Sequence, residues 1–143
     1  MPTRVLFLCI HNSARSQMAE AYLKKLGGAA YEVFSAGLEP GTLNPLAVNA
    51  MALDGVDISK NLTKSVFDYF EKGTSFDYVI TVCDASSADK CPVFPGVNKK
   101  FSWDFQDPSQ LKGNPVEKLN QTILVRDQIK QAVLDFIKLN SNK

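Results

Sequence analysis

Short apolar runs recur along this chain, separated by stretches in which apolar positions have a helical spacing. Runs with few polar residues are typical of strands that are covered on both faces, as in parallel sheets. Four segments are predicted as strands: Arg4–Leu8, Tyr31–Ser35, Phe76–Cys83 and Val97–Trp103, of which Arg4–Leu8 is almost wholly apolar. The run at 76–83 is a strong strand candidate because it is rich in β-branched residues.

The intervening stretches carry signals for helix ends. A first helix is expected to end at Gly27-Gly28, because glycine commonly follows the last helical turn. A second begins at Asn44-Pro45, an N-cap followed by proline, and a short one is expected at Ser65–Phe70. The last begins at Asn114-Pro115, where Glu117 completes a capping-box arrangement. This alternation predicts an α/β fold of three layers, with a central four-stranded parallel sheet flanked by helices.

The length of 143 residues suits one domain, and we expect residues 1–143 to form a single one. In an open α/β sheet, ligands bind beyond the carboxyl ends of the strands. Cys9–Ser16 follows the first strand, Cys83 ends the third, and Trp103–Pro108 follows the fourth. The sequence therefore predicts the functional site at this edge of the sheet.

Composition and charge narrow the classes of partner. A net charge of +1 gives no sign of a nucleic-acid-binding or polybasic membrane-binding surface. The apolar run Val5–Ile10 is too short for a signal-peptide core or a membrane span. We therefore expect a cytoplasmic monomer with no nucleic-acid or membrane partner. In a reducing compartment, its odd count of three cysteines points to chemistry or burial rather than to structural disulfides.

The segment from Cys9 to Ser16 reads C-x5-R-S and lies between a strand and a helix. Successive backbone N–H groups in such a loop can form a nest for a tetrahedral oxyanion, and the Arg15 guanidinium can hold two of its oxygens. The same positive field is expected to lower the pKa of the Cys9 thiol. We expect Asn12 in a left-handed or side-chain-bridged conformation, and His11 facing solvent. The predicted oxyanion-binding residues are Ile10, His11, Asn12, Ser13, Ala14, Arg15 and Ser16.

A carboxylate follows the fourth strand at the same edge. Asp107-Pro108 alone is most often a simple turn, but its position makes Asp107 a candidate general acid toward a leaving oxygen. A zinc site built from the single histidine and the three cysteines would lack a closely spaced cysteine pair. No metal ligand is therefore predicted.

Together these motifs resemble the low-molecular-weight tyrosine phosphatase superfamily over essentially the whole chain. The resemblance implies a strand order of 2-1-3-4. The phosphatases typically carry D-P-Y and lack a later cysteine pair, whereas here Ser109 follows Asp107-Pro108. Several segments are more similar to arsenate reductases of the thioredoxin-coupled type: Cys9–Glu20, Ser35–Gly37, Thr81–Cys83 with Cys91-Pro92, Trp103 and Val125–Asp127.

This resemblance implies reduction of arsenate to arsenite, for arsenic detoxification. The Cys9 thiolate would attack arsenate while Asp107 protonates the departing oxygen, and Cys83 would then attack Cys9 and release arsenite. Cys91 would resolve the disulfide to Cys83–Cys91, which reduced thioredoxin would reduce. Neighbouring first and third strands would end about 4.8 Å apart, which suits a disulfide. Phosphate and sulfate should bind as analogues of arsenate, and no tightly bound cofactor is implied.

The resemblance also allows a comparison with the potassium site of some of these reductases. Glu20, Asn12 and Ser35 match positions that bind potassium in some of these reductases. The matching segment Asn61–Ser65 lacks the expected acidic residue, and its Lys64 could supply the positive charge instead. This argues against a potassium requirement.

Other functions stay open at this point. A low-molecular-weight phosphatase would use Cys9 as nucleophile and Asp107 as general acid, and a reductase could keep weak phosphatase activity because phosphate and arsenate are nearly isosteric. A redox or oxyanion sensor would bind the anion and oxidise without turnover. The reductant could be thioredoxin, glutaredoxin or another thiol, and the Cys83–Cys91 arrangement favours thioredoxin.

Overall fold

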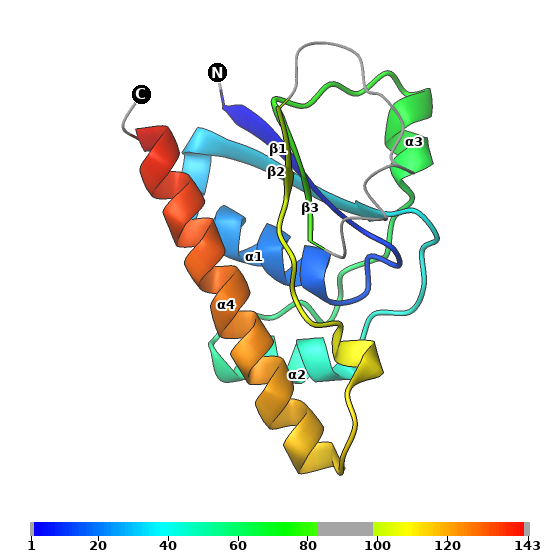
Figure 1. Ribbon diagram of the computed structural model, residues 1–143. Helices are drawn as coiled ribbons and strands as arrows, with labels where there is room; N and C mark the ends of the chain where they lie inside the picture. The colour runs from blue at the N-terminus through cyan, green and yellow to red at the C-terminus, as the bar shows by residue number, and fades with distance from the viewer. Residues whose placement is uncertain (1, 83–98, 142–143) are drawn as a thin grey trace.

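The computed structural model describes residues 2–82 and 99–141, which form a four-stranded parallel sheet between layers of helices (Figure 1). The strands are β1 (Thr3–Cys9), β2 (Tyr31–Gly37), β3 (Tyr78–Thr81) and β4 (Lys99–Ser102). Their order is β2-β1-β3-β4 and every neighbouring pair is parallel, which confirms the predicted fold class and strand order. Cys83 and Cys91 lie outside the described residues.

Helices cover both faces of the sheet. Within the described ranges they are α1 (Arg15–Gly27), α2 (Pro45–Leu53), α3 (Val66–Glu71) and α4 (Pro115–Ser141). α1 packs against β1, β2 and α4, and α2 packs against α4, whereas α3 contacts β2. Figure 1 shows α1, α2 and α4 on one side of the sheet and α3 on the other. No helix of the described residues is long and apolar enough to cross a membrane.

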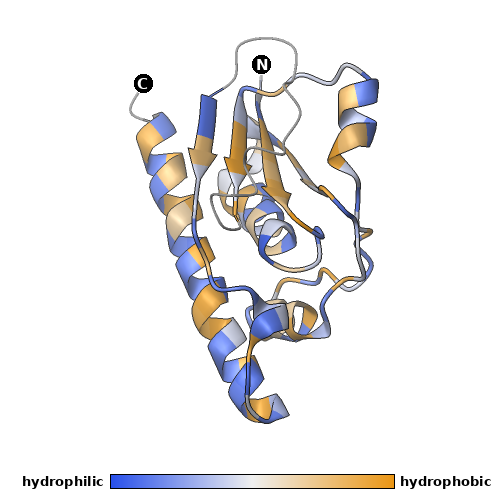
Figure 2. Cartoon of the chain, turned by 45° about the vertical axis from the view of Figure 1, so that its right-hand side comes forward, coloured by the Kyte–Doolittle hydropathy of each residue, from blue (hydrophilic) through white to orange (hydrophobic). Residues whose placement is uncertain are grey.

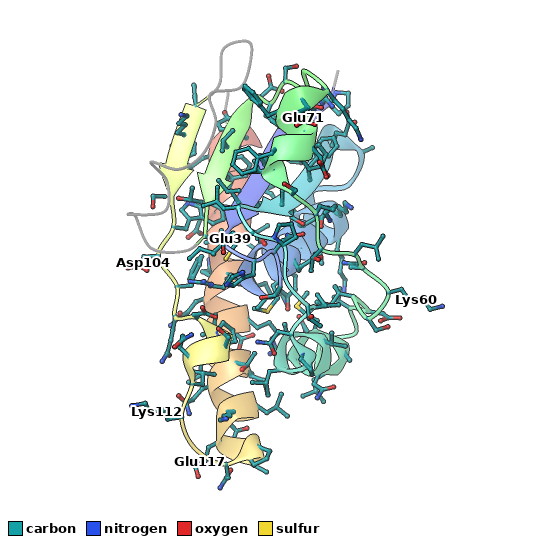
Figure 3. All side chains as sticks on the ribbon, turned by 90° about the vertical axis from the view of Figure 1, so that its right-hand side faces the viewer. Glu39, Lys60, Glu71, Asp104, Lys112 and Glu117 are labelled. Atoms are coloured by element: carbon teal, nitrogen blue, oxygen red, sulfur yellow. The ribbon has the colours of Figure 1, made fainter. Side chains whose placement is uncertain are left out.

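The burial of β1 explains why its sequence is a continuous apolar run. This strand lies between β2 and β3, and its side chains point alternately to the two faces of the sheet. Val5 and Phe7 join the core cluster that includes α1 and α4 residues, while Leu6 and Leu8 pack with Val66 of α3. In Figure 2 the strands at the centre of the sheet are mostly orange, whereas the edge strand β4 begins in blue. Charged side chains such as Lys60, by contrast, project into solvent (Figure 3).

The helix starts predicted at Asn44, Ser65 and Asn114 are present, whereas α1 begins without a capping side chain. The side chains of Asn44, Ser65 and Asn114 each accept a hydrogen bond from a backbone N–H two or three residues later, at 2.8, 3.2 and 2.8 Å. These bonds satisfy donors that a helix start would otherwise leave without an acceptor. α1 instead begins at Arg15 directly after the β1 loop, with no side-chain cap. The first N–H groups of α1 therefore have no side-chain acceptor from an N-cap residue.

A polar cluster joins three helices on one side of the sheet. The Tyr22 hydroxyl of α1 donates to Asp54 Oδ2 at 2.7 Å, and Lys130 Nζ of α4 donates to the same oxygen at 3.1 Å. The bond from Tyr22, followed by the bond from Lys130, lowers the pKa of Asp54 below its ordinary value. Burial, and then the bond to Asp54, raises the pKa of Tyr22. This cluster therefore ties the C-terminal end of α2 to α1 and α4.

Candidate active site

The loop after β1 turns its carbonyl groups toward the segment that follows β2. Four backbone N–H groups of residues 38–44 donate to carbonyls of residues 9–13 at 2.8–3.2 Å. The pairs are Leu38 to Cys9, Glu39 to Ile10, Gly41 to His11 and Asn44 to Ser13. In a trans peptide, the C=O and the next N–H point in opposite directions. The N–H groups of residues 10, 11, 12 and 14 therefore point away from residues 38–44, and none of them donates to another described backbone group.

Asn12 shapes this loop through its backbone and its side chain. It has a φ of 54°, which is in the left-handed region, and it is completely buried. Its Oδ1 accepts from the Lys64 N–H at 3.0 Å, and its Nδ2 donates to Ser16 Oγ at 2.8 Å. The prediction of a left-handed or side-chain-bridged residue is therefore confirmed in both respects.

The loop can lie this close to β2 only because Gly37 has no side chain. A Cβ built at Gly37 would be 2.7 Å from the Ile10 carbonyl oxygen and 2.8 Å from the Asn12 nitrogen. Both contacts are with backbone atoms, which cannot move aside as a flexible side chain can. Sequence reasoning identified Gly37 only as part of the segment Ser35–Gly37 that resembles the arsenate reductases, and it missed this contact because the two segments are distant in sequence.

Arg15 lies at the end of the loop and is largely buried, with 7% of its side chain exposed. Its Nη1 donates to the Phe105 carbonyl at 3.1 Å, and its Nη2 lies 3.3 Å from Asp107 Oδ2. Its Nε is buried and has no hydrogen-bond partner among the described residues. A guanidinium has five N–H donors, so Arg15 retains donor capacity for an anion held in the loop.

Asp107 is both a turn residue and a neighbour of Arg15. Its Oδ1 accepts from the Ser109 N–H at 2.9 Å and from Ser109 Oγ at 2.8 Å, and it caps the short 3-10 helix Pro108–Gln110. Its other oxygen faces the guanidinium, and its side chain is 28% exposed. The structure thus brings Asp107 to the same edge as Arg15, and solvent can reach its carboxylate.

Cys9 ends β1 and is buried, at 4% exposure. β3 lies beside β1: Leu8 is opposite Thr81, and the Val82 N–H donates to the Leu8 carbonyl at 2.9 Å. The described chain therefore runs alongside β1 as far as Val82. The predicted partners Cys83 and Cys91 lie beyond this point, outside the described residues.

Glu20 of α1 is a buried carboxylate with two lysine partners that are partly exposed. It is 5% exposed and accepts a hydrogen bond from Ser35 Oγ at 2.7 Å. Lys64 Nζ lies 3.5 Å from the same carboxylate and Lys24 Nζ 3.1 Å from it. Two ammonium groups therefore lie beside the single negative charge of Glu20. Among the described residues, no group of three or more His, Cys, Asp or Glu side chains is arranged to hold a metal ion.

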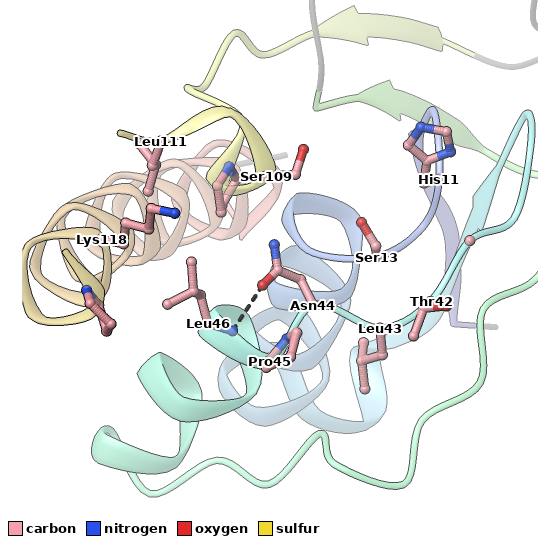
Figure 4. A pocket seen from close by; sticks show the side chains of 13 residues that line it. His11, Ser13, Thr42, Leu43, Asn44, Pro45, Leu46, Ser109, Leu111 and Lys118 are labelled. Carbon is pink, nitrogen blue, oxygen red and sulfur yellow. Dashed lines mark hydrogen bonds between the residues drawn. The ribbon is translucent and has the colours of Figure 1, made fainter. Parts of the chain in front are cut away.

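A pocket of about 720 Å³ opens beside the loop (Figure 4). His11 and Ser13 line one part of it, and Leu46, Ser109 and Lys118 come from α2, the 3-10 turn and α4. His11 is exposed, as predicted, and its Nδ1 lies 2.8 Å from the Glu39 carbonyl oxygen. Sequence reasoning missed this pocket, because its walls come from segments that only the tertiary fold brings together.

A loop at the carboxyl edge of a parallel sheet, with Cys9 before it and Arg15 at its end, is the arrangement expected of the phosphatase-like class of proteins. A family model for low molecular weight phosphotyrosine protein phosphatases matches residues 4–141, and the chain belongs to this family. The resemblance inferred from the motifs is therefore confirmed.

Individual relatives show the subgroup that this chain is similar to. An arsenate reductase of Bacillus subtilis (strain 168) is 42% identical over 132 residues, which cover 92% of this chain and 93% of that protein. A solved arsenate reductase in the phosphate binding state matches with a TM-score of 0.73 and 30% identity, covering 95% of this chain and 97% of that one. A thioredoxin-dependent arsenate reductase of Corynebacterium glutamicum matches with a TM-score of 0.68 and 29% identity, covering 97% of this chain and 63% of that one.

Proposed function

We propose that this chain is an arsenate reductase, which converts arsenate to arsenite for arsenic detoxification. The observation that carries the proposal is a set of donors around the loop, namely the N–H groups of residues 10, 11, 12 and 14 and Nε of Arg15, which donate to no backbone group in the part of the chain that the structure describes. Donors arranged around a loop that enters an uncapped helix suit a tetrahedral oxyanion. The arsenate reductases among its relatives support the choice of arsenate as that anion.

In the first step, the Cys9 thiolate attacks arsenic and water leaves. The start of α1 and Arg15 supply positive potential that favours the thiolate form of Cys9. Asp107, which is partly exposed and 3.3 Å from Arg15, delivers a proton to the departing oxygen. The Ser16 hydroxyl donates a hydrogen bond to the Cys9 sulfur when this atom carries negative charge. The product is a Cys9–arsenic adduct that is still at the arsenic(V) level.

In the second step, the Cys83 thiolate attacks Cys9 Sγ. The sulfur–arsenic bond breaks, its electron pair stays on arsenic, and arsenite leaves as the Cys9–Cys83 disulfide forms. The pairing of β1 with β3 supports this step, because adjacent strands lie about 4.8 Å apart and disulfides join Cα atoms at about 4.4–6.8 Å. Cys91 then attacks Cys83, which restores the Cys9 thiol and leaves a Cys83–Cys91 disulfide.

The remaining disulfide needs a two-electron donor, and we assign this role to reduced thioredoxin. A thioredoxin-dependent relative supports the assignment, as does the thiol–disulfide chemistry of the relay. A chain that needs reduced thiols would work in the cytoplasm. We further propose that residues 1–143 act as one monomeric domain without a tightly bound cofactor. Lys64 beside Glu20 supplies the charge that a potassium ion would otherwise bring.

A single turnover tests the proposal. Fully reduced protein is mixed with one equivalent of arsenate, the arsenic species are separated, and the thiols are mapped by mass spectrometry. The expected result is one equivalent of arsenite, a Cys83–Cys91 disulfide and a reduced Cys9. Three reduced thiols without arsenite would refute the reductase, and a persistent Cys9–Cys83 disulfide would remove Cys91 from the relay.

A weak phosphatase activity is a second candidate function, and the pocket beside the loop favours it. A cavity of about 720 Å³ can receive the organic group of a phosphate monoester whose phosphate is held in the loop. Replacing Cys83 and Cys91 together by serine should then abolish arsenate reduction but retain slow hydrolysis of para-nitrophenyl phosphate. Loss of both activities in a folded protein would exclude the phosphatase.

A further inference from the structure

The buried side chain of Gln17 forms hydrogen bonds at each of its polar atoms. Gln17 lies in the first turn of α1 and has no solvent exposure. Its Nε2 lies 3.1 Å from the Asn12 carbonyl, 3.0 Å from Asn12 Oδ1 and 3.0 Å from the Leu62 carbonyl, so its two hydrogens are shared among three acceptors. Its Oε1 accepts from Asn61 Nδ2 at 3.1 Å. The Gln17 amide therefore connects α1, the segment 61–64 and the loop of residues 9–16, which is called the oxyanion loop below.

Backbone hydrogen-bond partners determine the orientation of the Gln17 and Asn12 side-chain amides. A carbonyl oxygen can only accept, so the Gln17 atom that faces the Asn12 and Leu62 carbonyls is the nitrogen. A backbone N–H can only donate, so the Asn12 atom that faces the Lys64 N–H is the oxygen. The other end of the Asn12 amide is then the Nδ2 that donates to Ser16 Oγ.

This orientation constrains the Ser16 hydroxyl. Because Ser16 Oγ accepts from Asn12 Nδ2, its own hydrogen must point to a different group. Ser16 follows Arg15 at the start of α1 and is completely buried. In the mechanism proposed above, the acceptor of that hydrogen is the Cys9 sulfur.

We infer that Gln17 is a positioning residue for the oxyanion loop. It holds Asn12 in its left-handed conformation by binding both the backbone and the side-chain oxygen of that residue. It thereby directs Asn12 Nδ2 to Ser16 and the Ser16 hydroxyl to the loop. The inference rests on the proposed function, because it requires that residues 9–16 hold the anion and that Cys9 acts as a thiolate.

A purely structural role would have a different effect. If Gln17 only joined α1 to residues 61–64, its loss would lower the free energy of unfolding and leave the loop chemistry unchanged. If it positions the loop, its loss should also weaken anion binding and make the Cys9 thiolate harder to form. Anion affinity and the pH dependence of Cys9 reactivity therefore separate the two roles.

The test uses the full chain with Cys83 and Cys91 replaced by serine, so that Cys9 is the only cysteine left of the three. In this parent protein, the rate of Cys9 alkylation by iodoacetamide is measured against pH, and protection by inorganic phosphate gives a dissociation constant. Gln17→Met keeps a side chain of similar length but has no donor. The control is Val133→Ala, which removes volume from the buried face of α4.

With Gln17→Met, we expect phosphate affinity to fall about 3- to 10-fold and the alkylation midpoint to rise by about half a pH unit or more, as loss of one or two hydrogen bonds implies. Val133→Ala should lower the unfolding temperature with both values unchanged. Unchanged values in folded Gln17→Met would overturn the inference. If Gln17→Met does not fold, Asn61→Ala decides: changes in the same direction support the inference, and unchanged values overturn it.

The parent protein separates this inference from the proposed function. If phosphate does not protect Cys9 in the parent, both the proposed function and the inference fail. If phosphate protects the parent and Gln17→Met equally well, the inference alone fails.

Discussion

At the scale of single residues, Asp107 and Arg15 each make two kinds of contact in the site. Asp107 caps a 3-10 turn with one carboxylate oxygen and faces Arg15 with the other. Arg15 binds the Phe105 carbonyl and Asp107 through its two terminal nitrogens, and its Nε has no partner in residues 2–82 and 99–141. Contacts within the protein therefore orient the guanidinium before an anion arrives, so binding need not order this side chain first.

Replacing Arg15 by lysine tests the importance of this planar group. Lysine keeps the positive charge but cannot contact Phe105, Asp107 and an anion through a rigid fork. We expect phosphate affinity to fall about 10- to 100-fold, as loss of hydrogen bonds to a charged group implies. Calorimetric titration with phosphate measures this change. Arg126→Lys, at an arginine that donates to the Ala50 carbonyl on α2, should leave the affinity unchanged, and equal losses in both variants would contradict the assignment.

Gly37→Ala tests the close contact between β2 and the loop. The added Cβ would meet backbone atoms of the loop at 2.7–2.8 Å, so we expect a stability loss of about 1–3 kcal/mol, together with weaker phosphate binding. Gly55→Ala is the control, because it has a positive φ of 76° but nothing within 4 Å of its Cβ. It should cost about 1 kcal/mol through backbone strain alone and leave binding unchanged. Equal phosphate affinity in both variants would show that the contact does not shape the loop.

At the scale of elements, α1 connects the site to the rest of the helical layer. Its first turn carries Arg15, Ser16 and Gln17, and further along Tyr22 bonds to Asp54, which Lys130 of α4 also contacts. The bonds from Tyr22 and Lys130 lower the pKa of Asp54. A lowered carboxylate pKa contributes stability at pH values above the unfolded pKa of about 3.9, and this contribution is lost as pH falls through the lower folded value.

Asp54→Asn should therefore destabilise the protein in a pH-dependent way. We expect it to reduce the free energy of unfolding by about 1 kcal/mol at pH 7, since the ion pair is partly exposed and its bonds involve a charged group. Urea unfolding followed at several pH values measures the difference from the unchanged protein. This difference should shrink below about pH 4, where the unfolded carboxyl is protonated. A difference that stays constant down to pH 2.5 would contradict the role of the charge.

At the scale of the whole molecule, the parallel sheet collects distant segments at one edge. The loop after β1, the segment after β2 and the residues after β4 meet there, because every strand runs in the same direction. A ligand bound between them contacts several parts of the fold at once. Its binding free energy should therefore add to the stability of the entire fold.

Phosphate should raise the unfolding temperature of the protein. At a concentration 100 times its dissociation constant, a ligand that binds only the folded state adds about 2.7 kcal/mol. For a protein of this size, that corresponds to a rise of roughly 5–10 °C. Scanning calorimetry with phosphate, and with nitrate at equal ionic strength as the control, measures the effect. An equal rise with both anions would indicate a general salt effect instead of a tetrahedral site.

The sequence alone determined the elements of this fold and the local part of the site. The apolar runs of β1 and β3 became strands because both faces of the sheet are covered there, and C-x5-R-S predicted the loop because strand, loop and helix are contiguous. Glycine and N-cap signals placed the helix ends for the same local reason. The sequence and the resemblance predicted Asp107 at the same edge as Arg15 and Lys64 as a charge near Glu20, but only the tertiary structure gave these contacts, brought Gly37 to the loop and revealed Gln17 behind Asn12. These contacts join segments far apart in the chain, and their distances depend on strand order and packing, which no local pattern of residues encodes.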